Sequence, residues 1–160
     1  MEKVIFAAGC FWGVQFYFDQ VPGVIATTVG YTGGHTKNPT YEQVCTHLTG
    51  HAEAVLVEFD PKKVSFDILL KQFFRMHDPT QLNRQGPDVG DQYRSAIYYF
   101  SEEQREEINK IKEVVQANFK EPIVTQIEPA GDFYKAEDYH QKFTEKTGHG
   151  MCHIPYAAVK

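Results

Sequence analysis

The chain has 160 residues, 42% of them hydrophobic, and its formal net charge is −5. This length supports one domain with its own core, so we expect a single domain over residues 1–160. Lysine and arginine are scattered, and no stretch has the pattern of a secretory signal or a membrane span, which excludes nucleic acid and membrane as partners and predicts a cytoplasmic protein.

Strand and helix signals alternate along the chain in the order β-α-β-β-α-β-α-β-α. Apolar and β-branched runs predict strands over residues 4–8, 24–31, 52–59, 93–100 and 122–127. Apolar residues at helical spacing predict helices over residues 14–18, 65–75, 101–120 and 136–146, with a short one at 41–46. This pattern predicts an α/β (α+β) fold, a two-layer sandwich with a ferredoxin-like split β-α-β core and long coil segments.

Cys10 stands between two glycines at the point where a buried strand gives way to a helix. The unpaired N–H groups and the dipole of a helix start favour the thiolate, which is the reactive form of cysteine. Phe11 and Trp12 would give the sulfur an apolar wall suited to a small uncharged group. The alternative is a buried cysteine that acts as a small hydrophobe, but the strand-to-helix position favours a nucleophile.

Glu53 would lie at the beginning of the strand at 52–59, where its side chain can face a pocket. A solvent-exposed edge position is the alternative that the residues alone favour.

Cys45, His47 and His51 are zinc-ligand types, but the group lacks a clear fourth ligand. We therefore expect no metal.

A long polar segment at 78–90 is rich in glycine and proline, and loops of this length are usually functional or mobile. It offers Asp88 as an acceptor, and Tyr93 beyond it as a donor, at the mouth of a pocket, although an ordinary solvated turn would look the same.

From about residue 147 the tail is glycine-rich, and its flexibility would let Cys152 reach another sulfur. Long-range cysteine pairs in a reducing compartment are transient and catalytic, so a nucleophile with a resolving partner is expected.

Six strings in unbroken order resemble the A-type peptide methionine sulfoxide reductases. They are GCFWG at 9–13, GYTGG at 30–34, NPTYEQVC at 38–45, GHAEAV at 50–55, NRQG at 83–86 and QYRS at 92–95. The resemblance implies thiol-dependent reduction of methionine S-sulfoxide, free or in proteins. By the same resemblance Cys10 attacks the sulfoxide sulfur, and Phe11, Trp12 and Gly13 form the substrate pocket around the methyl group.

The resemblance also assigns the groups around the sulfoxide oxygen. Glu53 would protonate that oxygen, a role for which burial would raise its pKa. Tyr41 and Tyr93 would hold the same oxygen, and Asp88 would help to order the pocket. All four are therefore expected both in catalysis and in substrate binding.

The cycle that the resemblance implies ends with Cys152. Attack leaves Cys10 as a sulfenic acid, with which Cys152 condenses as the resolving cysteine. Thioredoxin, or dithiothreitol in vitro, then reduces the disulfide, with no bound cofactor and a monomeric enzyme expected. Cys45 would be structural. The sequence departs from the family at Pro87, where Asn is usual, and at Asp91, where Thr is common.

Two other classes of function are weighed against this one. A peroxide-reducing thiol enzyme would also cycle through a sulfenic acid. A non-catalytic interaction module would keep the fold without using Cys10.

Overall fold

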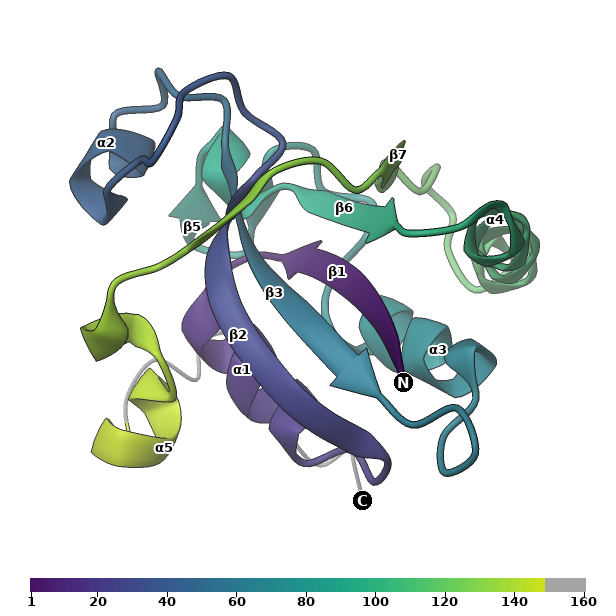
Figure 1. The fold of residues 1–160 in the computed structure, drawn as a ribbon. Helices are drawn as coiled ribbons and strands as arrows, with labels where there is room; N and C mark the ends of the chain where they lie inside the picture. The colour runs from purple at the N-terminus through teal and green to yellow at the C-terminus, as the bar shows by residue number, and fades with distance from the viewer. Residues whose placement is uncertain (149–160) are drawn as a thin grey trace.

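The computed structural model describes residues 1–148 (Figure 1). Its main sheet has six strands in the order β7-β6-β1-β3-β2-β8. All neighbouring pairs are antiparallel except β6 and β7, so the sheet is mixed. The strands are β1 (Glu2–Ala8), β2 (Val24–Thr32), β3 (Ala52–Phe59), β6 (Ser95–Tyr99), β7 (Gln126–Pro129) and β8 (Phe133–Lys135), with a separate hairpin of β4 (Arg84–Gln85) and β5 (Asp88–Val89).

Five α-helices and two 3-10 turns connect the strands in the described residues. They are α1 (Phe11–Asp19), α2 (Tyr41–Cys45), α3 (Phe66–Met76), η1 (Asp91–Tyr93), α4 (Glu102–Gln116), η2 (Asp138–His140) and α5 (Phe143–Thr147). Helix α1 leads from β1 to β2, and these two strands flank β3 in the sheet. The predicted α/β class and the split arrangement of β1 and β2 around β3 are therefore confirmed.

Serine side chains cap α3 and α4, at the first residues of the helices predicted over 65–75 and 101–120. The Ser65 hydroxyl accepts the N–H of Ile68 at 3.3 Å, and the Ser101 hydroxyl accepts the N–H of Gln104 at 3.2 Å. The Gln104 side chain returns to the N–H of Phe100 at 2.8 Å, one residue before the cap. Each such cap contributes about 1 kcal/mol to helix stability.

The central strand β1 is buried on both faces. Val4 and Phe6 belong to the core cluster that α1 and α3 cover, whereas Ile5 and Ala7 belong to a smaller cluster on the opposite face. In Figure 1 the segment after β7 crosses this opposite face, and its residue Ala130 packs against the smaller cluster. A strand covered on both faces reads as a continuous apolar run, as residues 4–8 do.

The sheet is a curled half-barrel rather than one flat layer of a sandwich. Consecutive strands β7 and β8 lie at its two opposite edges, yet only residues 130–132 separate them. Four Cα–Cα steps span at most about 15 Å, whereas six flat strands would place the edges about 24 Å apart. The sheet must therefore curl until its edges approach one another, which corrects the expected two-layer sandwich.

The C-terminal third differs most from prediction. The helix predicted at 136–146 is wrong, because this segment holds η2 and then α5 (Figure 1). Strand β8 is not predicted, the strand predicted at 122–127 lies instead at Gln126–Pro129, and Tyr93 ends η1 rather than starting β6. Among residues 1–148, none of the helices has the length and apolar character needed to cross a membrane.

Candidate active site

Cys10 lies where β1 ends and α1 begins. It is the N-cap residue of α1, and its side chain is 8% exposed. The N–H of Phe11, the first residue of the helix, donates to Oε1 of Glu53 at 3.2 Å. The Glu53 carboxyl group therefore binds the helix start that Cys10 caps, where the dipole favours a thiolate.

Glu53 lies inside the sheet rather than at its edge. Strand β3 pairs with β1 on one side and with β2 on the other, and Glu53 is 1% exposed. Its neighbours Ala52 and Ala54 belong to the cluster on the opposite face, so Glu53 faces the side of α1. The exposed edge position is therefore wrong. Burial disfavours the ionised form of a carboxyl group, which suits a proton donor.

Aromatic rings surround this helix start. The ring of Phe11 lies 5.6 Å from that of Tyr31 and 6.5 Å from that of Tyr41, measured between centroids. The indole of Trp12 stacks on Phe143 at 4.0 Å and lies 6.4 Å from Tyr41. Gly13 is buried in the first turn of α1. Aromatic side chains from α1, α2, β2 and α5 thus cluster around the two residues that follow Cys10.

Two tyrosine hydroxyls belong to the same region. Tyr41 begins α2, which Thr40 caps, and Tyr93 ends η1. Burial raises the pKa of both hydroxyls, and the charge of Glu53 adds to the effect at each. The charge of Cys10 raises the pKa of Tyr93 further. Both hydroxyls therefore keep their protons at neutral pH and remain hydrogen-bond donors beside Glu53.

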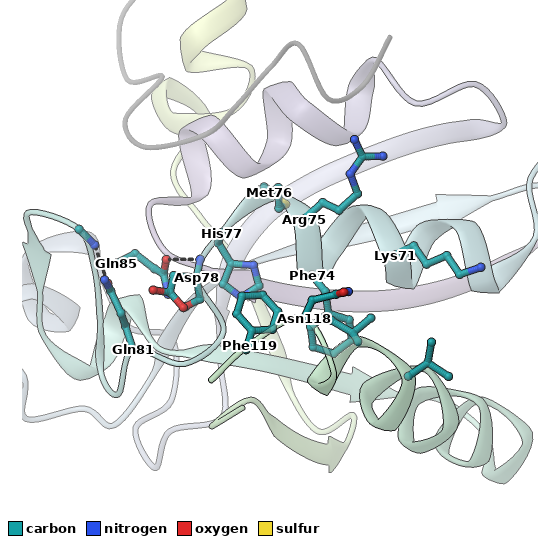
Figure 2. Close-up of a pocket in the computed structure, with 13 residues that line it drawn as sticks. Lys71, Phe74, Arg75, Met76, His77, Asp78, Gln81, Gln85, Asn118 and Phe119 are labelled. Atoms are coloured by element: carbon teal, nitrogen blue, oxygen red, sulfur yellow. Dashed lines mark hydrogen bonds between the residues drawn. The ribbon is translucent and has the colours of Figure 1, made fainter. Parts of the chain in front are cut away.

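A braced loop holds Asp88. The segment 78–90 contains the β4–β5 hairpin, and Asp88 is the first residue of β5. Gln85 binds the backbone of Asp78 twice, with Nε2 donating to its carbonyl at 2.6 Å and Oε1 accepting its N–H at 3.0 Å (Figure 2). Asp88 is one of the charges that act on Tyr93, after burial and Glu53. The loop is thus ordered, and its carboxylate lies near the other site residues.

A cavity of about 720 Å³ lies between α3, α4 and the loop after α3 (Figure 2). Apolar side chains such as Phe74, Met76 and Phe119 form much of its lining. It contains none of the site residues predicted from the sequence. We therefore give it no part in the reaction.

The zinc-ligand types at Cys45, His47 and His51 do not converge. His47 pairs through Nδ1 with the Gln92 side chain at 2.7 Å, whereas Nε2 of His51 lies 2.7 Å from the Thr36 carbonyl. Within residues 1–148, no three His, Cys, Asp or Glu side chains are arranged to hold a metal ion.

Residues 137–142, which we call the C-terminal strap, complete the wall of the site and are missed by the sequence reasoning. Glu137 receives two hydrogen bonds, from the Tyr31 hydroxyl to Oε1 at 2.9 Å and from the Tyr41 N–H to Oε2 at 3.0 Å. One carboxylate therefore fixes two of the aromatic residues around Cys10.

His140 and Gln141 anchor the same strap. His140 is fully buried, and its Nδ1 accepts the indole N–H of Trp12 at 2.8 Å. Burial lowers the pKa of His140, and the charge of Glu137 opposes this only in part, so the ring is neutral at pH 7. The Gln141 side chain bonds the N–H and the carbonyl of Val29, each at 3.0 Å. The strap is thereby tied to both α1 and β2.

Glu137→Gln is expected to lower the free energy of unfolding by about 1–3 kcal/mol at pH 7. Burial acts to raise the pKa of Glu137, but the hydrogen bonds from Tyr41 and Tyr31 outweigh it and hold the pKa below its ordinary value of 4.5. A depressed folded-state pKa stabilises the fold above pH 4.5, and this stabilisation is lost as the pH falls through the folded-state value. Urea unfolding at pH 7 and at about pH 3 measures both effects.

The matched control is Asp138→Asn, since the Asp138 side chain is 97% exposed. This variant is expected to change stability by less than about 0.5 kcal/mol. A loss in Glu137→Gln that is equally large at both pH values would contradict the proposed role of the carboxylate charge.

The sequence also singles out Cys152, Pro87 and Asp91. Cys152 lies outside the described residues. Pro87 occupies the turn of the β4–β5 hairpin. Asp91 begins η1, with Oδ1 at 3.7 Å from Nδ1 of His47.

Comparison with known proteins agrees with this arrangement. Residues 2–160 match the family described as peptide methionine sulfoxide reductase. The peptide methionine sulfoxide reductase MsrA of Methanosarcina acetivorans is 60% identical over 150 residues, which are 92% of this chain and 80% of that protein.

Solved structures agree as well. The crystal structure of Mxr1 from Saccharomyces cerevisiae in reduced form matches with a TM-score of 0.91 and 36% identity, over 97% of this chain and 90% of that one. Mxr1 in complex with Trx2 matches with a TM-score of 0.65 and 28% identity, over 89% and 84%. The chain therefore belongs to the peptide methionine sulfoxide reductase family, as an oxidoreductase that reduces methionine sulfoxide.

Proposed function

We propose that Cys10 is the nucleophile that reduces the S epimer of methionine sulfoxide, free or in proteins. One observation carries this proposal: the Phe11 N–H joins the buried Glu53 carboxyl group to the helix start that Cys10 caps. This contact would hold a thiolate and a proton donor near one helix start, with the surrounding rings as an apolar wall. Reduction of a sulfoxide requires both groups.

The first step transfers oxygen from the substrate to Cys10. The thiolate attacks the sulfoxide sulfur and forms a transient sulfur–sulfur bond while the oxygen takes up a proton. That bond and the substrate sulfur–oxygen bond then break as the oxygen bonds to the cysteine sulfur. Methionine leaves with its sulfur reduced by two electrons, and Cys10 is oxidised to a sulfenic acid. Phe11, Trp12 and Gly13 would hold the methyl group on the apolar side of the sulfur.

Glu53 would supply the proton that the oxygen needs in this step. Tyr41 and Tyr93 would donate hydrogen bonds to the same oxygen, a role supported by the raised pKa of each hydroxyl. Hydrogen bonds placed where charge develops act strongly when water is excluded. Asp88 would help to order the pocket from its braced hairpin.

Cys152 would then resolve the sulfenic acid by forming a disulfide with Cys10 and releasing water. Cys45 is a poor candidate for this step. Burial raises the pKa of its thiol, and the hydrogen bond with Tyr41 opposes this only in part. Its thiol also lies one turn from Tyr41 within α2. We therefore assign Cys45 a structural role.

Thioredoxin would reduce the Cys10–Cys152 disulfide, and dithiothreitol would replace it in vitro. The complex of the structurally similar Mxr1 with Trx2 supports a reductant of this kind. The cycle then needs no bound cofactor, because each electron pair passes between sulfur atoms.

The test is an assay of both sulfoxide epimers with dithiothreitol. The S epimer is expected to be converted to methionine and the R epimer to be left unchanged. Hydrogen peroxide at the same concentration serves as the competing substrate. Faster consumption of peroxide than of sulfoxide, or equal conversion of the two epimers, would contradict the proposal.

Cys152→Ser is expected to separate reduction from recycling. One equivalent of methionine per enzyme should still form, because attack by Cys10 does not require the second sulfur, but turnover with thioredoxin should collapse. The sulfenic acid should accumulate and react with dimedone. Rapid-quench measurement of methionine, followed by mass spectrometry of the protein, gives both results.

Cys45→Ser is the matched control and should keep thioredoxin-dependent turnover close to that of the wild type. A Cys10–Cys45 disulfide in the oxidised wild-type protein would assign the resolving role to Cys45 instead. Full cycling without Cys152 would do the same.

A further inference from the structure

A second, polar cavity of about 450 Å³ opens on the face of the sheet away from α1 and α3. Its lining includes Thr36, Arg94 and Tyr98. Tyr98 belongs to the core cluster of that face, with Ile5 and Ala7, so the sheet separates this cavity from Cys10. The reaction proposed above uses none of these three side chains.

Arg94 is a buried cation without an acidic partner in the part of the chain that is described. It is 8% exposed, and its three hydrogen bonds go to neutral acceptors. These acceptors are the Gln126 side chain at 3.1 Å, the Asp91 carbonyl at 3.0 Å and the Tyr98 hydroxyl at 3.4 Å. Buried charges are usually paired. Since arginine has five N–H donors, two of them remain for another acceptor.

Two hydroxyl groups add donors to the same cavity. The Thr36 hydroxyl oxygen is buried and makes no hydrogen bond within residues 1–148. Tyr98 is 3% exposed and accepts from Arg94, which leaves its own O–H free to donate. Burial raises the pKa of Tyr98, and Arg94 opposes this only in part, so the hydroxyl keeps its proton.

The backbone at Gly33 makes room for these donors. Its φ is +85°, and a Cβ there would lie 2.4 Å from the Tyr98 hydroxyl and 2.8 Å from a guanidinium nitrogen of Arg94. His51 fixes the following loop, because it accepts the Gly34 N–H and contacts the Thr36 carbonyl. The donors are thus held in place by the surrounding chain.

The charges at the rim limit what the cavity accepts. Lys37, Glu128 and Asp132 line it and are exposed. The two carboxylates oppose a highly charged anion, whereas the inner donors require oxygen acceptors. A small anion of low charge satisfies both conditions.

We propose that this cavity binds a small oxyanion of low charge, whose oxygens accept from the free N–H groups of Arg94 and from the hydroxyls of Tyr98 and Thr36. The group is an organic carboxylate or the monoanion of inorganic phosphate. A carboxylate matches the planar guanidinium fork. This site is separate from the sulfoxide site and does not depend on the reaction proposed there.

Titration of the folded protein with acetate or phosphate, against chloride at equal ionic strength, tests the proposal. We expect a saturable shift of the Arg94 Nε–H resonance, with the stronger response identifying the preferred oxyanion. Tyr98→Phe and Thr36→Val should each weaken binding about tenfold to a hundredfold, as loss of one hydrogen bond to a charged acceptor does. Arg94→Gln should abolish it.

Arg75→Gln is the matched control, because Arg75 lines the other cavity on α3, and it should leave the affinity unchanged. Should Arg94→Gln fail to fold, the two hydroxyl variants decide the outcome. A response no larger than that to chloride, or an affinity that Tyr98→Phe and Thr36→Val both leave unchanged, would overturn the proposal.

Discussion

Cys10→Ser is expected to reduce methionine formation to below about one thousandth of the wild-type rate. A serine hydroxyl is not ionised at neutral pH, whereas the helix start favours a thiolate at Cys10. The fold should be retained, because the Cys10 side chain makes no capping hydrogen bond to α1 and serine is a preferred N-cap residue. Stability should therefore be unchanged or higher by up to about 1 kcal/mol.

Single-turnover assays with the S epimer and dithiothreitol measure the activity, and urea unfolding measures the stability. Cys45→Ser controls for the loss of any thiol. Methionine production by Cys10→Ser at a rate near that of the wild type would remove Cys10 from the mechanism. If Cys10→Ser lost both its activity and its folded state, wild-type protein carboxymethylated at Cys10 would test the mechanism instead. That protein should be folded and inactive.

Glu53→Gln is expected to slow the reductive step by about 10²–10⁴-fold, the usual contribution of a general acid. The amide keeps an oxygen that accepts the Phe11 N–H, so the local geometry should persist. It has no proton of suitable acidity for the departing oxygen. Single-turnover formation of methionine isolates this step from recycling by thioredoxin.

Glu58→Gln is the matched control on the same strand, because within residues 1–148 Glu58 forms only a 3.8 Å pair with Lys3, away from the site. Its rate should match that of the wild type. If Glu53→Gln reduced the sulfoxide at a near-normal rate, the proton would have to come from another group, with Tyr41 and Tyr93 the next candidates.

Local sequence signals predict the first two thirds of the fold well. Strand β3 has the predicted bounds 52–59, and α3 begins where Ser65 predicts a cap. The bounds of both elements follow from local features, the apolar run of β3 and the cap and helical spacing of α3, although the strands with which β3 pairs do not. The curl of the sheet is not predictable in this way, because it results from β7 and β8 occupying opposite edges.

The C-terminal third is predicted poorly because its structure also depends on contacts between residues far apart in the chain. Residues 136–146 have helical spacing, but the Glu137 carboxylate and the Gln141 side chain bond to residues about a hundred positions earlier, and these contacts override the local preference. The sequence signal for this segment was the string Glu137-x-x-His140-Gln141. Its three polar residues lie close together in the chain, and the structure places them beside the aromatic site.

Local sequence predicts one part of the site, and contacts between distant residues determine another. The position of Cys10 follows from the strand-to-helix junction alone. The burial of Glu53 does not, because it depends on β3 having neighbours on both sides, and these are β1 and β2 rather than residues near it in sequence.

The position of the C-terminal strap also has a consequence for protein synthesis. Cys10 is synthesised well before Glu137 and His140, which fix Tyr31, Tyr41 and Trp12. Until the strap emerges, a nascent chain therefore carries Cys10 without the contacts that fix these three aromatic residues. We infer that the site is complete only after the C-terminal strap has left the ribosome and packed against these residues.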